Sequence, residues 1–447
     1  MDRNTMMQTI AREANEKGAF TGAWLLAEKG EIVSKGAVGW RDPDDTLPVR
    51  EDSVFDLASV SKHFTASAVM LLRRRGLLDL EDDITKFFPD IPYAGVTIRN
   101  LLTHTSGMPD YMPWVDKLAK EENTIPGNDV VIRFLKESGA KPRFAPGEKY
   151  EYCNTGYCVF AELVEKLSGE KFEDFMRDNI FEPAGIHATR VRHPRRDGVE
   201  PENWARPMVL EDGRYVLPEN SKANSFMTRL DGSSGDGYVY SSVLDLFAWD
   251  RALKAGTVLT KEEQDIMYAP GVKLPGDDEG EVGYGFGWVV FDSKKYGRVL
   301  SHSGGWPGVS TWIGRYLDAD RMLVILGCRA VDEHGDDSFL RAMSAVGRGG
   351  EVKPVACVED LEIKDPDKSK WESWCGKYET DPEDDSIDVV FLKDGELWAK
   401  VVTDMGYVYD TKLYPVGEKT FTFKEYDTEI EFCDGGYERD GETVKKL

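Results

Sequence analysis

The stretch FDLASVSKHFTASAVMLLRRRGLL, which begins at Phe55, constrains the fold more than any other part of this 447-residue chain. Strand-like residues come first, and an apolar run with near-helical spacing follows until Gly76, a typical helix terminator. The apolar positions at that spacing are Phe64, Ala68, Val69 and Leu72. The pattern predicts a strand, a turn and a long apolar helix, with Ser59 at the start of the helix.

Ser59 and Lys62 lie three residues apart at this predicted helix start, so their side chains share one face. A serine hydroxyl is a poor nucleophile at neutral pH and needs a base within hydrogen-bond reach. Burial and the positive end of the helix dipole both favour a neutral amine on Lys62, which then accepts the Ser59 proton. Two other Ser-x-x-Lys matches, at residues 138–141 and 168–171, fall where helices are predicted to end.

A second motif, Tyr152-Cys153-Asn154, precedes another predicted helix. A tyrosine near the amine can relay a proton to the leaving group, and an asparagine amide can orient a substrate carbonyl. Taken alone, such residues in a helix-entry loop are more often structural.

A third motif, His302-Ser303-Gly304-Gly305, lies on a predicted strand. The glycines allow a substrate backbone to approach the strand edge, and the Gly305 N–H can pair with the Ser59 N–H as an oxyanion hole. A lone strand histidine is more often a packing residue, so His302 gains meaning only beside the other motifs.

Together the three motifs resemble the signature of the penicillin-recognising serine hydrolases: Ser-x-x-Lys, then Ser-x-Asn or Tyr-x-Asn, then Lys-Thr-Gly or His-x-Gly. The similarity covers about residues 10 to 345 and is strongest to class C β-lactamases, DD-peptidases and D-aminopeptidases. It implies that Ser59 is the nucleophile, Lys62 its base and Tyr152 the proton relay. It also implies that Asn154, His302, Gly304 and Gly305 bind the substrate.

The resemblance implies an α/β (α+β) fold in which helices sandwich an antiparallel sheet, with an inserted helical subdomain and the site in the cleft between them. Residues 1–350 are predicted to form this domain. A Gly-, Pro- and charge-rich linker follows at 351–358. The strand pattern of residues 359–447 predicts a small antiparallel β-barrel, which resembles the lipocalin-like modules of some D-aminopeptidases.

Composition narrows the classes of molecule that this chain is expected to bind. A net charge of -25 without a basic stripe disfavours nucleic acid and anionic lipid, and no run approaches the about 20 apolar residues of a membrane span. The first residues lack the apolar segment of a secretory signal, so a cytoplasmic protein is expected unless a signal has been trimmed from this sequence. Six cysteines are too few for a disulfide framework, and no metal-ligand spacing or cofactor motif is found.

The function predicted from these features is acyl transfer through Ser59, as a peptidase or amidase on small peptides, including those with D-residues. A carboxylesterase and an acyltransferase are open alternatives, and so is a sensor that binds ligand without turnover. Because His302 stands where β-lactamases carry lysine, efficient penicillin hydrolysis is not expected. The expected partner is a small-molecule or peptide substrate, and a homo-oligomer is compatible with the sequence.

Overall fold

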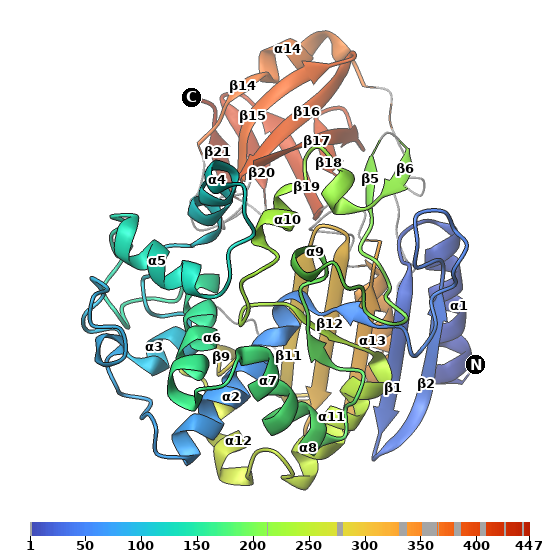
Figure 1. Ribbon diagram of the computed structural model, residues 1–447. Helices are drawn as coiled ribbons and strands as arrows, with labels where there is room; N and C mark the ends of the chain where they lie inside the picture. Colours follow the sequence, from blue (N-terminus) through green and yellow to red (C-terminus); the bar gives the residue numbers. More distant parts are fainter. Residues whose placement is uncertain are drawn as a thin grey trace.

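The computed structural model describes residues 2–211, 213–274, 280–329, 338–350, 364, 366–379, 386–402, 408–423, 426–439 and 442–447. Figure 1 shows a large body made of a sheet between helices, with a helical region beside it and a small barrel above. The predicted linker at 351–358 lies outside the described residues, so its boundaries stay a prediction.

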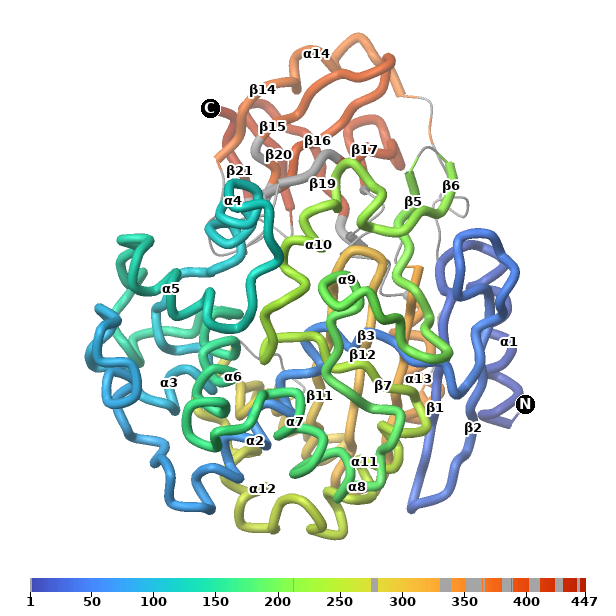
Figure 2. The backbone as a smooth tube through the Cα atoms, in the orientation of Figure 1, coloured from blue at the N-terminus to red at the C-terminus, as the bar shows by residue number. Residues whose placement is uncertain are grey.

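The body is built on an eight-stranded antiparallel sheet in the order β2-β1-β13-β12-β11-β10-β9-β8. The predicted N-terminal hairpin, β1 with β2, pairs along β13 and thereby joins two ends of the domain (Figure 2). The bounds are Gly22–Glu28 (β1), Glu31–Val38 (β2), Val272–Leu274 (β8), Gly280–Tyr284 (β9), Val289–Ser293 (β10), Gly297–Trp306 (β11), Val309–Tyr316 (β12) and Arg321–Gly327 (β13).

Alternation along β1 explains why both faces of the sheet are covered. Trp24 and Leu26 pack in one cluster with α1 (Arg3–Glu16) and α13 (Ser338–Arg348). Ala23 and Leu25 point to the opposite face, into the main core. That core includes apolar side chains of α2 (Lys62–Arg74) and α11 (Val243–Ala255). The predicted sandwich of helices around an antiparallel sheet is therefore confirmed.

The inserted helical region lies on the α2 side of the sheet (Figure 1). Its helices are α3 (Ile98–Leu102), α4 (Met112–Glu122), α5 (Asp129–Glu137), α6 (Asn154–Ser168), α7 (Phe172–Met176), α8 (Glu182–Ala184), α9 (Pro194–Asp197) and α10 (Phe226–Leu230). Smaller pieces connect it to the body: the three-stranded sheet β3 (Phe55–Asp56), β7 (Val239–Ser241) and β4 (Arg190–Val191), the hairpin β5 (Val209–Glu211) and β6 (Arg214–Val216), and helix α12 (Lys261–Met267).

The C-terminal part is an antiparallel meander of eight strands that curls into a barrel. Helix α14 (Trp371–Trp374) precedes strands β14 (Gly376–Lys377), β15 (Ser386–Lys393), β16 (Glu396–Val402), β17 (Val408–Pro415), β18 (Thr420–Phe423), β19 (Tyr426–Cys433), β20 (Gly436–Arg439) and β21 (Glu442–Lys445). The first strand meets the end of the last through a bridge between Tyr378 and Lys446. The predicted barrel is confirmed, while its lipocalin-like character stays a prediction.

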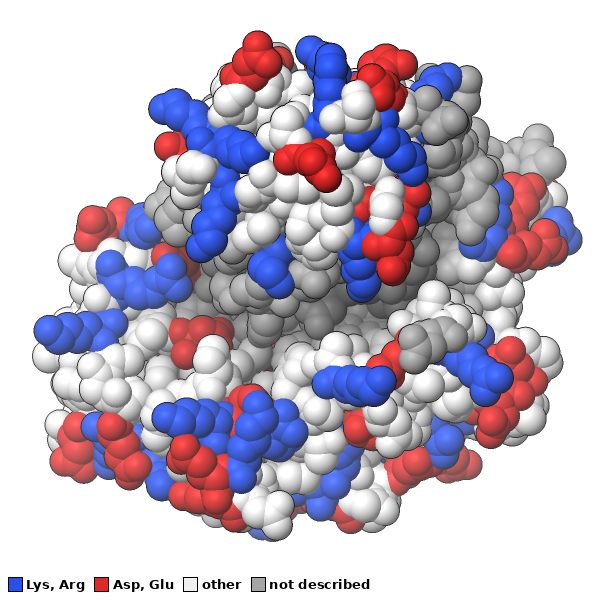
Figure 3. Space-filling view, turned by 90° about the horizontal axis from the view of Figure 1, so that it is seen from above, with Lys and Arg blue, Asp and Glu red and all other residues white. Residues whose placement is uncertain are grey.

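The barrel has a core of its own. Trp374 stacks on Phe432 with ring centroids 4.7 Å apart, and Trp371 meets Phe421 edge to face. These side chains form a cluster separate from the main core. On the face seen in Figure 3, basic and acidic side chains are interspersed, without a continuous positive patch.

Within the described residues, no helix combines the length and the apolar composition that a membrane span requires. The cysteines of the described residues, Cys153, Cys158, Cys328, Cys375 and Cys433, are free thiols.

We expect a chain that ends at residue 355 to fold without the barrel, because the two cores are separate. The truncated protein should show one cooperative thermal transition by circular dichroism, with the full-length chain as the control. Aggregation or loss of the transition would show that the body depends on the barrel.

Candidate active site

A sharp turn between β3 and α2 presents Ser59. Ala58 has a left-handed backbone with φ of 46°, a conformation that costs an alanine about 1 kcal/mol. The Asp56 carboxylate accepts the Ala58 N–H at 2.9 Å and holds the turn. Ser59 therefore lies in a 3-10 turn, Ala58–Ser61, just before α2, and is half-buried.

Lys62, the first residue of α2, is fully buried. Its Nζ donates to Ser59 Oγ at 3.0 Å, to Asn154 Oδ1 at 2.8 Å and to the Asp236 carbonyl oxygen at 2.8 Å. Burial lowers the pKa of Lys62 to about 8, although the Asp236 charge acts in the opposite direction. The predicted nucleophile and base are thus in contact, and the base is half neutral at mildly alkaline pH.

Tyr152, just before α6, and Asn154, its first residue, also lie beside Lys62. The Lys62 Nζ lies 4.9 Å from the centre of the Tyr152 ring. Burial raises the pKa of Tyr152 well above its ordinary value, and the Ser59 hydroxyl offsets part of that rise. Tyr152 is therefore a neutral phenol beside the serine, able to pass a proton without being ionised at rest.

A third segment holds the Tyr152-to-Asn154 loop. His104 Nδ1 accepts the Cys153 N–H at 3.1 Å, and the His104 ring lies 4.2 Å from the Tyr152 ring. The Cys153 thiol donates to the Met108 carbonyl at 3.2 Å. Burial lowers the pKa of His104 well below its ordinary range, so the ring is neutral. His104 thus supports the site as a structural residue.

The His302-to-Gly305 motif lies on β11, beside the Ser59 turn. His302 Nδ1 is 2.6 Å from the Ser303 carbonyl oxygen, and its Nε2 is 2.9 Å from the Tyr284 hydroxyl. Nδ1–H therefore donates to Ser303, and Nε2 accepts from Tyr284. Burial, with the Lys62 charge, lowers the pKa of His302 to about 4. At neutral pH this histidine carries no charge.

Gly304 allows β11 to approach Ser59 closely. A Cβ at this position would lie 2.4 Å from the Leu57 carbonyl oxygen and 3.1 Å from the Ser59 nitrogen. Thr311, opposite Gly304 on β12, donates its hydroxyl to the same Leu57 oxygen at 2.8 Å. Gly305 follows on β11 and is exposed. All seven residues that the motifs single out thus lie on the elements that converge at Ser59.

The three motifs do not include Asp236, which lies in the stretch GDGYVYSS at residues 235–242. Its carbonyl is one of three acceptors for Lys62, a role that main-chain geometry decides. The only signal was the Gly-Asp-Gly pattern, which marks a tight loop without naming its target. His63, next to Lys62, points away from Ser59 and stacks on Trp288, with ring centroids 4.4 Å apart.

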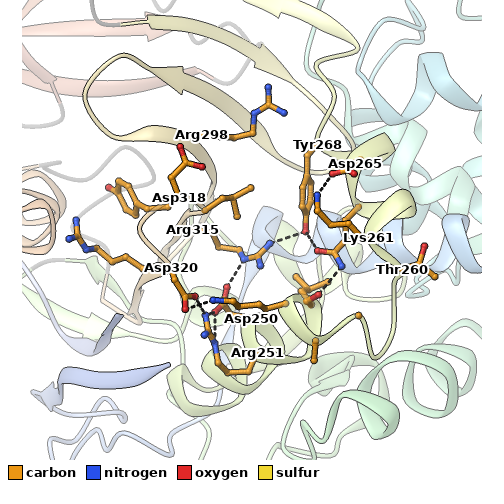
Figure 4. Close-up of a pocket in the computed structure, with 18 residues that line it drawn as sticks. Asp250, Arg251, Thr260, Lys261, Asp265, Tyr268, Arg298, Arg315, Asp318 and Asp320 are labelled. Carbon is orange, nitrogen blue, oxygen red and sulfur yellow. Dashed lines mark hydrogen bonds and ion pairs between the residues drawn. The ribbon is translucent and has the colours of Figure 1, made fainter. Parts of the chain in front are cut away.

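A hollow of about 800 Å³ lies between helices α11 and α12 and strands β11 to β13 (Figure 4). None of the residues that the motifs single out lines it. At its floor, buried Arg315 binds the Asp250 carboxylate at 2.6 Å and the Tyr268 hydroxyl at 2.8 Å. Arg251 bridges Asp250 and Asp320. These ion pairs tie β12 and the turn after it to α11, which gives the hollow a structural role.

The Beta-lactamase family profile matches residues 7–343. The chain belongs to the beta-lactamase family. Penicillin-binding protein 4* of Bacillus subtilis (strain 168) is 34% identical over 440 residues, which cover 96% of this chain and 93% of the relative. This membership identifies a serine hydrolase.

Solved structures of the beta-lactamase fold superpose on the chain. An octameric penicillin-binding protein homologue from Pyrococcus abyssi has a TM-score of 0.68 at 21% identity and covers 100% of this chain and 99% of its own. The D-amino acid amidase from Ochrobactrum anthropi SV3, complexed with L-phenylalanine amide, has a TM-score of 0.62 at 23% identity and covers 78% and 97%. At these identities the likeness shows the fold.

Thr311→Val tests the contact that fastens the Ser59 turn to β12. Valine keeps the shape but leaves the buried Leu57 carbonyl without this donor, so the free energy of unfolding should fall by about 1–3 kcal/mol. Urea unfolding measures it. The matched control is Ser310→Ala, at the exposed neighbouring position, which should stay within about 0.5 kcal/mol of the wild type. Equal losses in both variants would contradict the assignment.

Proposed function

We propose that this beta-lactamase family protein is an amidase or peptidase that forms an acyl-enzyme on Ser59. One observation carries the proposal: the buried Lys62 amine contacts Ser59 Oγ at 3.0 Å with a pKa lowered to about 8. A base whose pKa lies near the working pH removes a hydroxyl proton efficiently.

The proposed reaction runs in two halves. Neutral Lys62 takes the Ser59 proton as Oγ bonds to the substrate carbonyl carbon, and the N–H groups of Ser59 and Gly305 stabilise the oxyanion. The carbon–nitrogen bond then breaks, and the leaving amine receives the proton from Lys62 through the Tyr152 hydroxyl. In the second half, water passes a proton to Lys62 through the Tyr152 hydroxyl and attacks the ester carbonyl. The bond between the carbonyl carbon and Ser59 Oγ then breaks, Lys62 returns the proton to Oγ, and the acid is released.

Charge near Ser59 supports a neutral or amine-bearing substrate. His302 is neutral at neutral pH, so this strand presents no cation to a substrate carboxylate. Two carboxyl groups, Asp110 and Asp236, are close enough to Lys62 to act on its pKa. An ammonium group is favoured in such a field, and a carboxylate is disfavoured. The D-amino acid amidase named above, a protein of the same fold, forms a complex with L-phenylalanine amide, which is an amine-bearing compound.

Two alternatives share the site. An esterase or acyltransferase uses the same serine, and differs in the leaving group or in the acceptor that reaches the acyl-enzyme. A sensor that acylates without turnover is the alternative of another class. Close contact among Ser59, Lys62 and Asn154 favours a working catalyst, because it equips the site for both halves of the reaction.

Ser59→Ala should abolish covalent labelling by a fluorophosphonate probe, because the variant lacks the attacking oxygen. Intact-mass spectrometry measures the adduct, and a thermal melt confirms that the variant is folded. The control is Ser61→Ala. Ser61 is a buried serine of the same turn whose hydroxyl oxygen accepts the Val239 N–H, and this variant should still be labelled. Labelling of Ser59→Ala would place the nucleophile elsewhere.

The substrate class is tested with a panel of chromogenic D- and L-aminoacyl anilides, short-chain neutral esters and nitrocefin at neutral pH. We expect kcat/KM for an aminoacyl amide or neutral ester to exceed that for nitrocefin, because His302 offers no charge to the nitrocefin carboxylate. His302→Lys should raise nitrocefin turnover relative to the amides. Nitrocefin as the best wild-type substrate would refute this substrate class.

A further inference from the structure

Behind Lys62 lies a buried carboxylate that the reaction scheme does not use. Asp236 lies between α10 and β7 and is 5% exposed. Its main-chain oxygen holds Lys62 Nζ, and its side-chain Oδ2 accepts a hydrogen bond from the Tyr111 hydroxyl at 3.1 Å. The Tyr111 hydroxyl also contacts Ser233 Oγ at 3.1 Å. Oδ1 is buried and has no hydrogen-bond partner among the described residues.

Most titratable groups around Lys62 and Asp236 carry no charge at neutral pH. Burial lowers the pKa of the neighbouring histidines and raises the pKa of the thiols and phenols. The neutral groups are His104, His302, Cys153, Cys158, Tyr111, Tyr152, Tyr157 and Tyr238.

The remaining charged groups are few. Asp110 faces Lys62 from the loop before α4 and has a smaller effect on the Lys62 pKa than Asp236 has. Asp56 is close enough to Asp236 and Arg195 for their charges to act on it, and burial raises its pKa to about 6. Asp236 is therefore the main negative charge acting on the Lys62 amine. Burial raises the pKa of Asp236 itself, and Lys62 offsets part of that rise.

We propose that Asp236 is a positioning residue with two functions: its carbonyl fixes the Lys62 nitrogen, and its carboxylate is the buried counter-charge against which Lys62 gains and loses its proton. The carboxylate stabilises the ammonium that forms when Lys62 takes the proton of Ser59. It thereby raises the pKa of Lys62, so the amine is a stronger base but becomes neutral only at a higher pH. This inference rests on the proposed function of Ser59 and Lys62.

The test follows the rate of labelling by a fluorophosphonate probe between pH 5 and 10, measured by intact mass. In this reaction Ser59 Oγ bonds to phosphorus, fluoride leaves, and the serine proton goes to Lys62. The wild-type rate should rise with pH and reach half its plateau at about 8. Asp236→Asn keeps the carbonyl and removes the charge, so the midpoint should move down by about one pH unit. Its plateau should also fall, since the base is weaker.

Two further variants separate charge from structure. Tyr111→Phe keeps the carboxylate and the carbonyl but removes the donor that favours the ionised carboxylate, so its midpoint should fall by less than in Asp236→Asn. Ser233→Ala removes a hydroxyl from the same network without touching Asp236, and its midpoint should match the wild type. Tyr111→Phe also decides the question if Asp236→Asn does not fold, as judged by thermal melts.

The outcomes are distinguishable. The inference would be overturned if Asp236→Asn labels more slowly at every pH but keeps the wild-type midpoint. If only Tyr111→Phe folds, the same result in that variant would overturn it. Ser59 would remain the nucleophile in either case. A midpoint that rises would overturn the inference as well. A wild-type protein that does not label at Ser59 would overturn the proposed function, and the inference with it.

Discussion

The buried amine of Lys62 is the constraint on which the rest of the site depends. Removing an ammonium group from water costs several kcal/mol unless the protein supplies acceptors and opposite charge. Lys62 finds its acceptors in Ser59, Asn154 and the Asp236 carbonyl, which belong to three segments far apart in sequence. The turn before α2, the start of α6 and the loop before β7 must therefore converge on a single atom.

Ordinary packing brings those segments together. The strands around β11 are covered on both faces, and Gly304 lets β11 lie against the Ser59 turn without a side chain between them. Thr311 fastens that turn from the sheet side, and His104 fastens the loop before α6 from the helical side. Each of these two contacts is a single hydrogen bond between buried groups, so small changes at these positions displace reacting atoms.

The same burial decides the electrostatic character of the site. Histidines that are charged in acid when exposed are held neutral, and the phenol and thiol groups keep their protons. The charged groups that remain are the Lys62 amine and the carboxylates around it. This electrostatic field differs from that of a site with a second cation on β11. The selection of substrates by charge therefore follows from desolvation as much as from which residue occupies position 302.

From the sequence alone came the three motifs, the hairpin, the helix after Ser59, the antiparallel strands around His302 and the C-terminal meander. These are local patterns of period and turn chemistry, so they need no knowledge of distant contacts. The tertiary structure decided the 3-10 turn at Ser59, the neutrality of His302 and the place of Asp236 behind Lys62. Those features depend on which distant groups share a buried volume, because desolvation and main-chain acceptors are properties of the assembled fold and leave no mark in residue spacing.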